Sequence, residues 1–136
     1  MRITRRRLLM TATAAGLAPA GLALAAEPML EYTPGLIQAA LERGETVLVD
    51  YSAGWCSTCA RQERVITALR SANPAYDGAI TFVRVDWDDY RRHEVTTTRS
   101  IPRRSTLILL QGEAELGRIV AGTSEKQIKA LMDLAL

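Results

Sequence analysis

The chain has 136 residues, 48% of them hydrophobic, with 17 basic side chains, 15 acidic ones and a formal net charge of +2 at pH 7. This length suits one domain with a modest core and leaves no room for a second. Four of the basic residues lie in the first seven positions, and without them the remaining 13 face 15 acidic residues. The formal charge of the rest is therefore −2, which argues against nucleic acid as a partner.

The first 25 residues are predicted to be an export signal. Four arginines precede nineteen uncharged residues, Leu8 to Ala26, and Ala23-Leu24-Ala25 is a small-x-small cleavage site. The run from Thr4 to Leu9 is similar to a twin-arginine motif, although Met10 stands where a lysine is usual. Secretion by the general Sec route and an uncleaved membrane anchor are the alternatives. In each case residues 26–136 are expected to form the globular domain, and to lie in the periplasm.

The remaining chain alternates segments with helical and strand periodicity. In its first half we expect a helix opened by Thr33-Pro34 and ended by Gly44, a strand over 47–51, a helix to about Ser71 and a loop over 76–78. In its second half we expect a strand over 80–86, a loop with a short helix over 87–100, strands over 106–110 and 116–121, and a helix capped by Thr123 or Ser124. This order predicts an α/β fold in which helices flank a mixed four-stranded sheet.

The only two cysteines, Cys56 and Cys59, lie where the second helix is expected to begin. Unpaired backbone N–H groups and the helix dipole stabilise a thiolate there, so Cys56 can attack a disulfide and Cys59 can resolve the mixed disulfide. A structural bridge around so short a loop would remove little chain entropy. A zinc site would lack ligands, because His93 is the only histidine. The pattern therefore favours a redox-active dithiol that needs no other cofactor.

At these residues the chain resembles the thioredoxin superfamily. A strand ending in Asp50, a short turn and the W-C-x-x-C run from Trp55 to Cys59 form that family's active-site signature. The resemblance covers nearly all of residues 33–136 and implies a thioredoxin fold without its first edge strand. It makes Cys56 the nucleophile, Cys59 the resolving thiol and Asp50 the general base for Cys59, with Trp55 as a wall beside the sulfurs. The alternatives are an exposed Asp50 at the strand end and a half-buried packing role for Trp55.

The family also places a cis-proline before the strand that faces the dithiol, and two residues compete for that position. Pro102 looks like the motif, but an ungapped count back from Thr106 puts Ser105 there. We expect Ser105 to face the cysteines after a trans peptide bond, since a cis bond before a non-proline residue costs about 2.5 to 4 kcal/mol. Ser105, Thr106, Arg104 and Trp55 are then the expected substrate-binding residues. Arg103 and Arg104 are expected to stabilise the thiolate or to clamp carboxylates of glutathione or an acidic partner, or else to be solvated loop residues.

Together these features predict an exported thiol:disulfide oxidoreductase that acts as a monomer and reduces disulfides of exported proteins. We predict that the dithiol reduces its partners because Ser57 and Thr58 lie between the cysteines, whereas strongly oxidising relatives tend to carry histidine there. The resemblance implies a membrane thiol electron donor that reduces the dithiol again. Two alternatives stay open. One is a periplasmic metal-binding or copper-chaperone module that uses the same thiolates, and the other is a dithiol oxidant.

Overall fold

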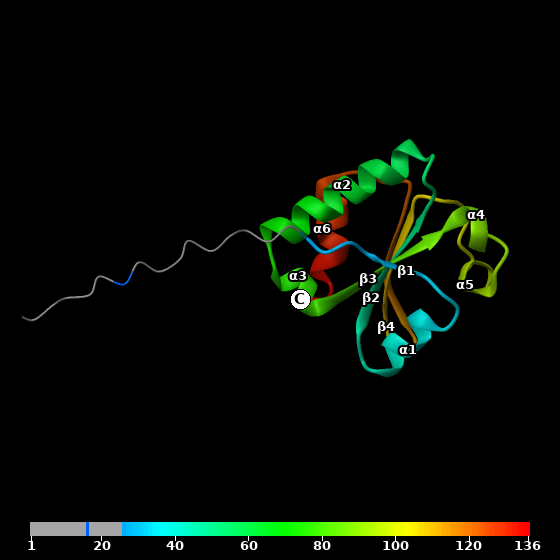
Figure 1. Ribbon diagram of the computed structural model, residues 1–136, viewed down its shortest axis with the longest axis horizontal. Helices are drawn as coiled ribbons and strands as arrows, with labels where there is room; N and C mark the ends of the chain where they lie inside the picture. Colours follow the sequence, from blue (N-terminus) through cyan, green and yellow to red (C-terminus); the bar gives the residue numbers. More distant parts are fainter. Residues whose placement is uncertain (1–15, 17–25) are drawn as a thin grey trace, which may run out of the picture.

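The computed structural model describes residue 16 and residues 26–136, so the predicted export signal lies outside the described residues except for Gly16. Figure 1 shows one central sheet with helices on both sides. The strands are β1 (Leu30–Glu31), β2 (Thr46–Ser52), β3 (Ile80–Asp86), β4 (Thr106–Gln111) and β5 (Ala114–Val120). The helices are α1 (Leu36–Glu42), α2 (Ser57–Ala72), α3 (Ala75–Ala79), α4 (Trp87–Tyr90), α5 (Glu94–Thr97) and α6 (Glu125–Asp133).

The sheet has the order β1-β3-β2-β4-β5, which places β2 at its centre. β2 pairs parallel with β3 and antiparallel with β4, and all seven of its residues are buried. A strand with both faces covered should be a continuous apolar run rather than an alternating one, as residues 47–49 are. The predicted α/β fold with a mixed sheet is confirmed.

Successive β2 side chains point to opposite faces of the sheet, and each face has its own helical layer. Val47, Val49 and Tyr51 pack with residues of α1 and α5. Leu48 packs with residues of α2, α3 and α6. The two layers are visible on either side of the strands in Figure 1. The core therefore has two halves separated by the sheet.

The predicted number of strands, four, is wrong, because β1 adds a fifth. β1 pairs parallel with β3, with Leu30 opposite Val83. A two-residue strand is too short to show a period in sequence, and its formation depends on a partner some fifty residues away. The expectation that the sheet lacks its first edge strand is therefore wrong.

Three local predictions also need correction. α1 begins at Leu36 after Gly35, which has a left-handed backbone (φ 89°), and no side chain caps it, so Thr33 is not its cap. The predicted loop over 76–78 lies inside α3, where the Asn73 carboxamide accepts the Ala75 N–H at 3.1 Å. The segment 87–100 contains two short helices instead of one.

The last helix begins as predicted, since the Ser124 hydroxyl accepts the Gln127 N–H at 3.4 Å.

Over the part of the chain that the structure describes, no helix combines the length and the apolar character that crossing a membrane requires.

Candidate active site

The two cysteines lie at the junction between β2 and α2. Cys56 is the N-cap of α2, and its sulfur accepts the Cys59 N–H at 3.1 Å. A turn after β2 sets this position, because the Cys56 N–H donates to the Ala53 carbonyl at 3.1 Å. The two sulfurs form a disulfide. Cys56 is 4% exposed and Cys59 is fully buried, so Cys56 is the sulfur nearer to solvent.

Ser105 lies directly against the disulfide. Its hydroxyl oxygen is 3.2 Å from the Cys56 sulfur and 3.0 Å from the Cys59 sulfur, and the side chain is fully buried. Its backbone is left-handed (φ 60°), and no described peptide bond is cis. Pro102 is exposed. The structure thus brings Ser105, and not Pro102, to the cysteines.

Gln62 is a site residue that the sequence analysis did not single out. It follows Cys59 by three residues on α2 and is fully buried. Its side-chain N–H groups donate to the carbonyl oxygens of Ser105 and Gly122, each at 2.9 Å. The available signal was its spacing, because Gln62 falls on the same helical stripe as Cys59, Ile66 and Leu69.

Asp50 is fully buried within β2, so it is not an exposed residue at a strand end. Strand alternation places its side chain on the face of Leu48, toward α2. Neither carboxylate oxygen has a hydrogen-bond partner. Burial, with a smaller contribution from the charge of Glu63, raises the pKa of Asp50 to about 7, against the opposing influence of Arg84. A carboxyl group with this pKa can take up and release a proton near neutral pH.

Trp55 and Arg104 form a pair beside the cysteines, in which Trp55 is exposed and Arg104 is half-buried. Trp55 is 61% exposed, and the Arg104 guanidinium lies 4.4 Å from the centre of its ring. The indole N–H donates to a carboxylate oxygen of Asp88 at 2.8 Å. Trp55 is therefore not a half-buried packing residue, and its large apolar face is held in a fixed orientation next to Cys56.

Thr106 differs from the other predicted substrate-binding residues. It is fully buried in β4, between Tyr51 of β2 and Val120 of β5. Its hydroxyl donates to the Arg103 carbonyl at 2.7 Å. Its side chain consequently holds the loop before β4 and does not reach the surface.

Comparison with known proteins agrees with this arrangement. The model of the family described as thioredoxin-like matches residues 29–111. This chain belongs to the thioredoxin-like family. A cysteine pair at the start of α2 in this fold makes it a thiol–disulfide oxidoreductase.

Individual thioredoxin relatives cover most of the domain. A putative thioredoxin-4 of Dictyostelium discoideum is 29% identical over 68% of this chain and 83% of its own length. Thioredoxin H2-1 of Oryza sativa subsp. japonica is 32% identical over 65% of this chain, and the match spans 59% of that relative. The crystal structure of Trxlp from Edwardsiella tarda is 33% identical and covers 78% of this chain and 97% of its own, with a TM-score of 0.62. The thioredoxin NaTrxh of Nicotiana alata, at 21% identity and a TM-score of 0.63, shares the fold.

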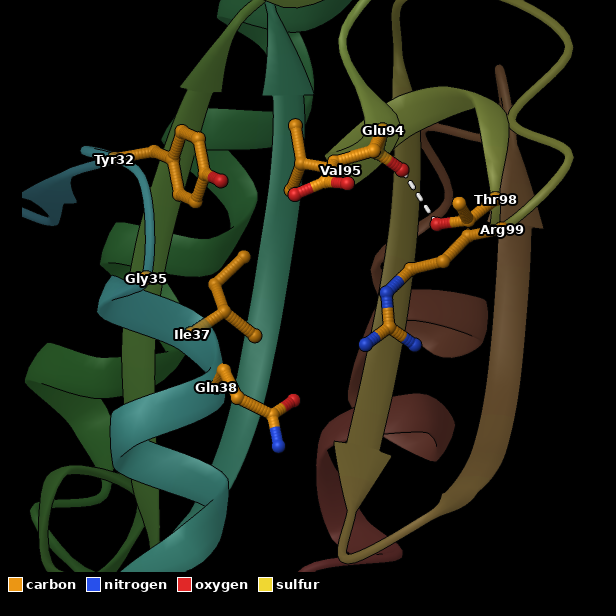
Figure 2. A pocket seen from close by; sticks show the side chains of 8 residues that line it. All are labelled: Tyr32, Gly35, Ile37, Gln38, Glu94, Val95, Thr98 and Arg99. Carbon is orange, nitrogen blue, oxygen red and sulfur yellow. Dashed lines mark hydrogen bonds between the residues drawn. The ribbon is translucent and has the colours of Figure 1, made fainter.

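This thioredoxin-like domain has a separate pocket of about 260 Å³ on the α1 and α5 side of the sheet. Figure 2 shows Tyr32 and Gln38 on the α1 side of this pocket, and Glu94 and Arg99 on the opposite side, from α5 and the segment after it. None of its eight lining residues is a predicted site residue. Within residues 26–136, no cluster of three or more His, Cys, Asp or Glu side chains is placed to hold a metal ion.

Proposed function

We propose that this protein is exported and reduces disulfide bonds of other exported proteins. The observation that carries the proposal is the asymmetry of the cysteine pair, in which Cys56 lies at the edge of the site and Cys59 is fully buried behind it. A partner disulfide reaches only the first sulfur. The second is reserved for the intramolecular step.

The reaction begins with the reduced dithiol. The Cys56 thiolate attacks one sulfur of the partner disulfide, and the other partner sulfur leaves as a thiolate. Asp50 then accepts the proton of the Cys59 thiol, and the Cys59 thiolate attacks the Cys56 sulfur. The second partner sulfur leaves, and the Cys56–Cys59 disulfide forms. Two electrons pass to the partner, and a membrane dithiol donor restores the reduced form.

Support for the reducing direction comes from the residues between the cysteines. Ser57 and Thr58 are partly or largely exposed hydroxyl residues, and neither carries a charge that would further stabilise the Cys56 thiolate. The dithiol is therefore less stabilised than it would be with a histidine there, so it gives up its electrons more readily. The equilibrium constant with glutathione tests this direction, and a value in the strongly oxidising range would favour the dithiol oxidant instead.

Trp55 and Arg104 are proposed to dock the partner. The exposed indole offers apolar area next to Cys56, and the guanidinium above it adds a positive charge. This combination suits an extended partner segment with a carboxylate near its disulfide. The proposed partner is thus an exported protein with an acidic residue beside the bond that is reduced.

Trapping tests the proposal. A full-length Cys59→Ser variant should accumulate mixed disulfides with exported proteins through Cys56, because the resolving step is removed. A Cys56→Ser variant is the matched control and should capture nothing. Failure of Cys59→Ser to retain any exported protein, in cells where the wild-type protein is found in the periplasmic fraction, would count against the reductase function.

A further inference from the structure

A single hydroxyl group links the two reactive sulfurs. The Ser105 oxygen lies 3.2 Å from the sulfur of Cys56 and 3.0 Å from that of Cys59. Within residues 26–136, no other side chain forms a hydrogen bond to either sulfur. Because the Ser105 side chain is fully buried beneath the sulfurs, its hydroxyl is available to them and not to a docked partner. This placement calls for a role other than the predicted substrate binding.

We propose that in the reduced protein the Ser105 hydroxyl accepts a hydrogen bond from the Cys59 thiol, donates one to the Cys56 thiolate, and is held in this position by Gln62. A hydroxyl group can accept and donate at once. A hydrogen bond to a charged acceptor is stronger than one to a neutral sulfur, so the donation favours the thiolate over the thiol and over the disulfide. Ser105 therefore makes Cys56 more acidic and stabilises the reduced form.

The placement of Ser105 depends on contacts from three parts of the fold. Its N–H donates to the Tyr51 carbonyl of β2 at 2.8 Å, and its carbonyl accepts the Ala121 N–H after β5, also at 2.8 Å. The same carbonyl accepts the Gln62 carboxamide of α2 at 2.9 Å. These bonds hold a serine in a left-handed conformation that non-glycine residues seldom adopt.

Gln62 is the contact that comes from the helix of the cysteines themselves. Its carboxamide nitrogen also donates to the Gly122 carbonyl, while its oxygen has no partner. The residue thus fixes the distance between α2 and the loop before β4, and with it the distance between the sulfurs and the hydroxyl. Gln62 touches neither sulfur, so it acts as a positioning residue.

Ser105→Ala is the first test, made on the full-length reduced protein. Loss of the hydrogen bond should raise the pKa of Cys56 by about one unit, a tenfold loss of thiolate below that pKa. The pKa is followed by the ultraviolet absorbance of the thiolate against pH. The equilibrium with glutathione should shift about tenfold, or about 30 mV, toward a more reducing dithiol. Ser100→Ala is the matched control, because Ser100 is also left-handed (φ 53°) but exposed, and it should change neither value.

Ser105→Gly removes the same hydroxyl while relaxing the backbone strain, and it should raise the pKa of Cys56 as Ser105→Ala does. A shift in the alanine variant alone would assign the effect to the backbone and overturn the proposal. An unchanged pKa in both variants would also overturn it. Gln62→Met should raise the pKa by a smaller amount in the same direction, and a loss of stability with no change in pKa would overturn the positioning role.

This inference deepens the proposed function and rests on its dithiol. Separate experiments test the reductase function and the role of Ser105, however. A wild-type protein that reduces no partner disulfide contradicts the reductase function, whereas the pKa comparison of the variants tests the Ser105 contact whatever the partner or the direction of electron flow.

Discussion

Asp50 places an ionisable group inside the interface between β2 and α2, and its burial ties the stability of the fold to pH. The folded-state pKa of about 7 lies above the ordinary value of 3.8, so the folded protein holds this proton more tightly than the unfolded chain does. The free energy of unfolding should therefore fall as the pH rises from about 4 to about 7, and level off above it. The total loss is on the order of 4 kcal/mol.

Asp50→Asn should remove this dependence, because asparagine does not ionise. Urea unfolding of the oxidised variant should give a nearly constant stability between pH 4 and pH 8, and a higher stability than the wild type at pH 8. Glu63→Gln is a suitable control, since it removes only the smaller influence on the pKa of Asp50. If the free energy of unfolding changed with pH in the same way in Asp50→Asn and in the wild type, Asp50 would not be the cause of the pH dependence.

The same substitution should slow the resolving step. Without a proton acceptor, the mixed disulfide between Cys56 and a small aromatic thiol should resolve at least tenfold more slowly at pH 7, and the rate should lose its inflection near pH 7. Rapid mixing of the reduced protein with an aromatic disulfide measures the two thiol release steps separately. The first release, which depends on Cys56, should be little changed. A slowed first step with a normal second step would contradict the role assigned to Asp50.

Among individual residues, those that take part in the reaction were easier to predict from the sequence than those that hold them in position. Cys56, Cys59 and Asp50 are recognisable because a CxxC pair and a carboxylate at the end of an apolar strand are costly or reactive wherever they occur. Gln62 is different, since its importance comes from two carbonyl groups that lie 43 and 60 positions further along the chain. A buried glutamine at helical spacing from Cys59 is visible in sequence, but its partners are not.

Among the elements, α2 is tied at its end to α3 and β3 through Arg70. The Arg70 side chain is 6% exposed, its guanidinium lies 4.3 Å from the centre of the Phe82 ring, and it pairs with Asp77 at 2.6 Å. Arg70→Met keeps the apolar stem but loses both contacts, so the free energy of unfolding should fall by about 1 to 2 kcal/mol. The exposed pair of Arg43 and Glu45 has the same 2.6 Å separation. Arg43→Ala should therefore change the stability by less than about 0.5 kcal/mol in the same urea titration.

Gly117 lets β5 approach α6. A Cβ atom at this position would lie 2.6 Å from a terminal methyl group of Leu131, so Gly117→Ala should lower the free energy of unfolding by about 1 kcal/mol. Gly78 of α3 has no heavy atom within 4 Å of a Cβ at its position. Gly78→Ala should raise stability by up to about 1 kcal/mol, because alanine favours a helix. The midpoint temperature of thermal unfolding should fall in Gly117→Ala and rise in Gly78→Ala. A rise in both variants would show that Leu131 moves away from the new methyl group without a loss of stability.

Local and long-range causes explain which elements could be predicted. β2, α2 and β3 have strong periods or continuous apolar runs, and α6 has a capping serine, so each is determined mostly by its own residues. β1 depends on pairing with β3, and α3 begins directly after Pro74, where the Asn73 carboxamide accepts the Ala75 N–H. Elements of two to five residues gain most of their stability from neighbours, which is why the sequence alone did not separate them from loops.

For the whole molecule, the described residues supply both halves of the core, one on each face of the sheet. A protein that begins at Ala26 should therefore unfold in a single cooperative transition, and its equilibrium with glutathione should match that of the full-length chain. Urea titrations followed by circular dichroism and by tryptophan fluorescence should coincide. Two separate transitions would contradict a single domain over 26–136.

The complete burial of Cys59 has a practical use. In the reduced native protein, a membrane-impermeant maleimide should label one sulfur per molecule, whereas an unfolded molecule should take two labels. The ratio of singly to doubly labelled chains, read as a mass difference, then reports what fraction of the protein in a cell extract is folded, with no antibody and no activity assay. The buried thiol that resolves the mixed disulfide can in this way also report whether a molecule is folded.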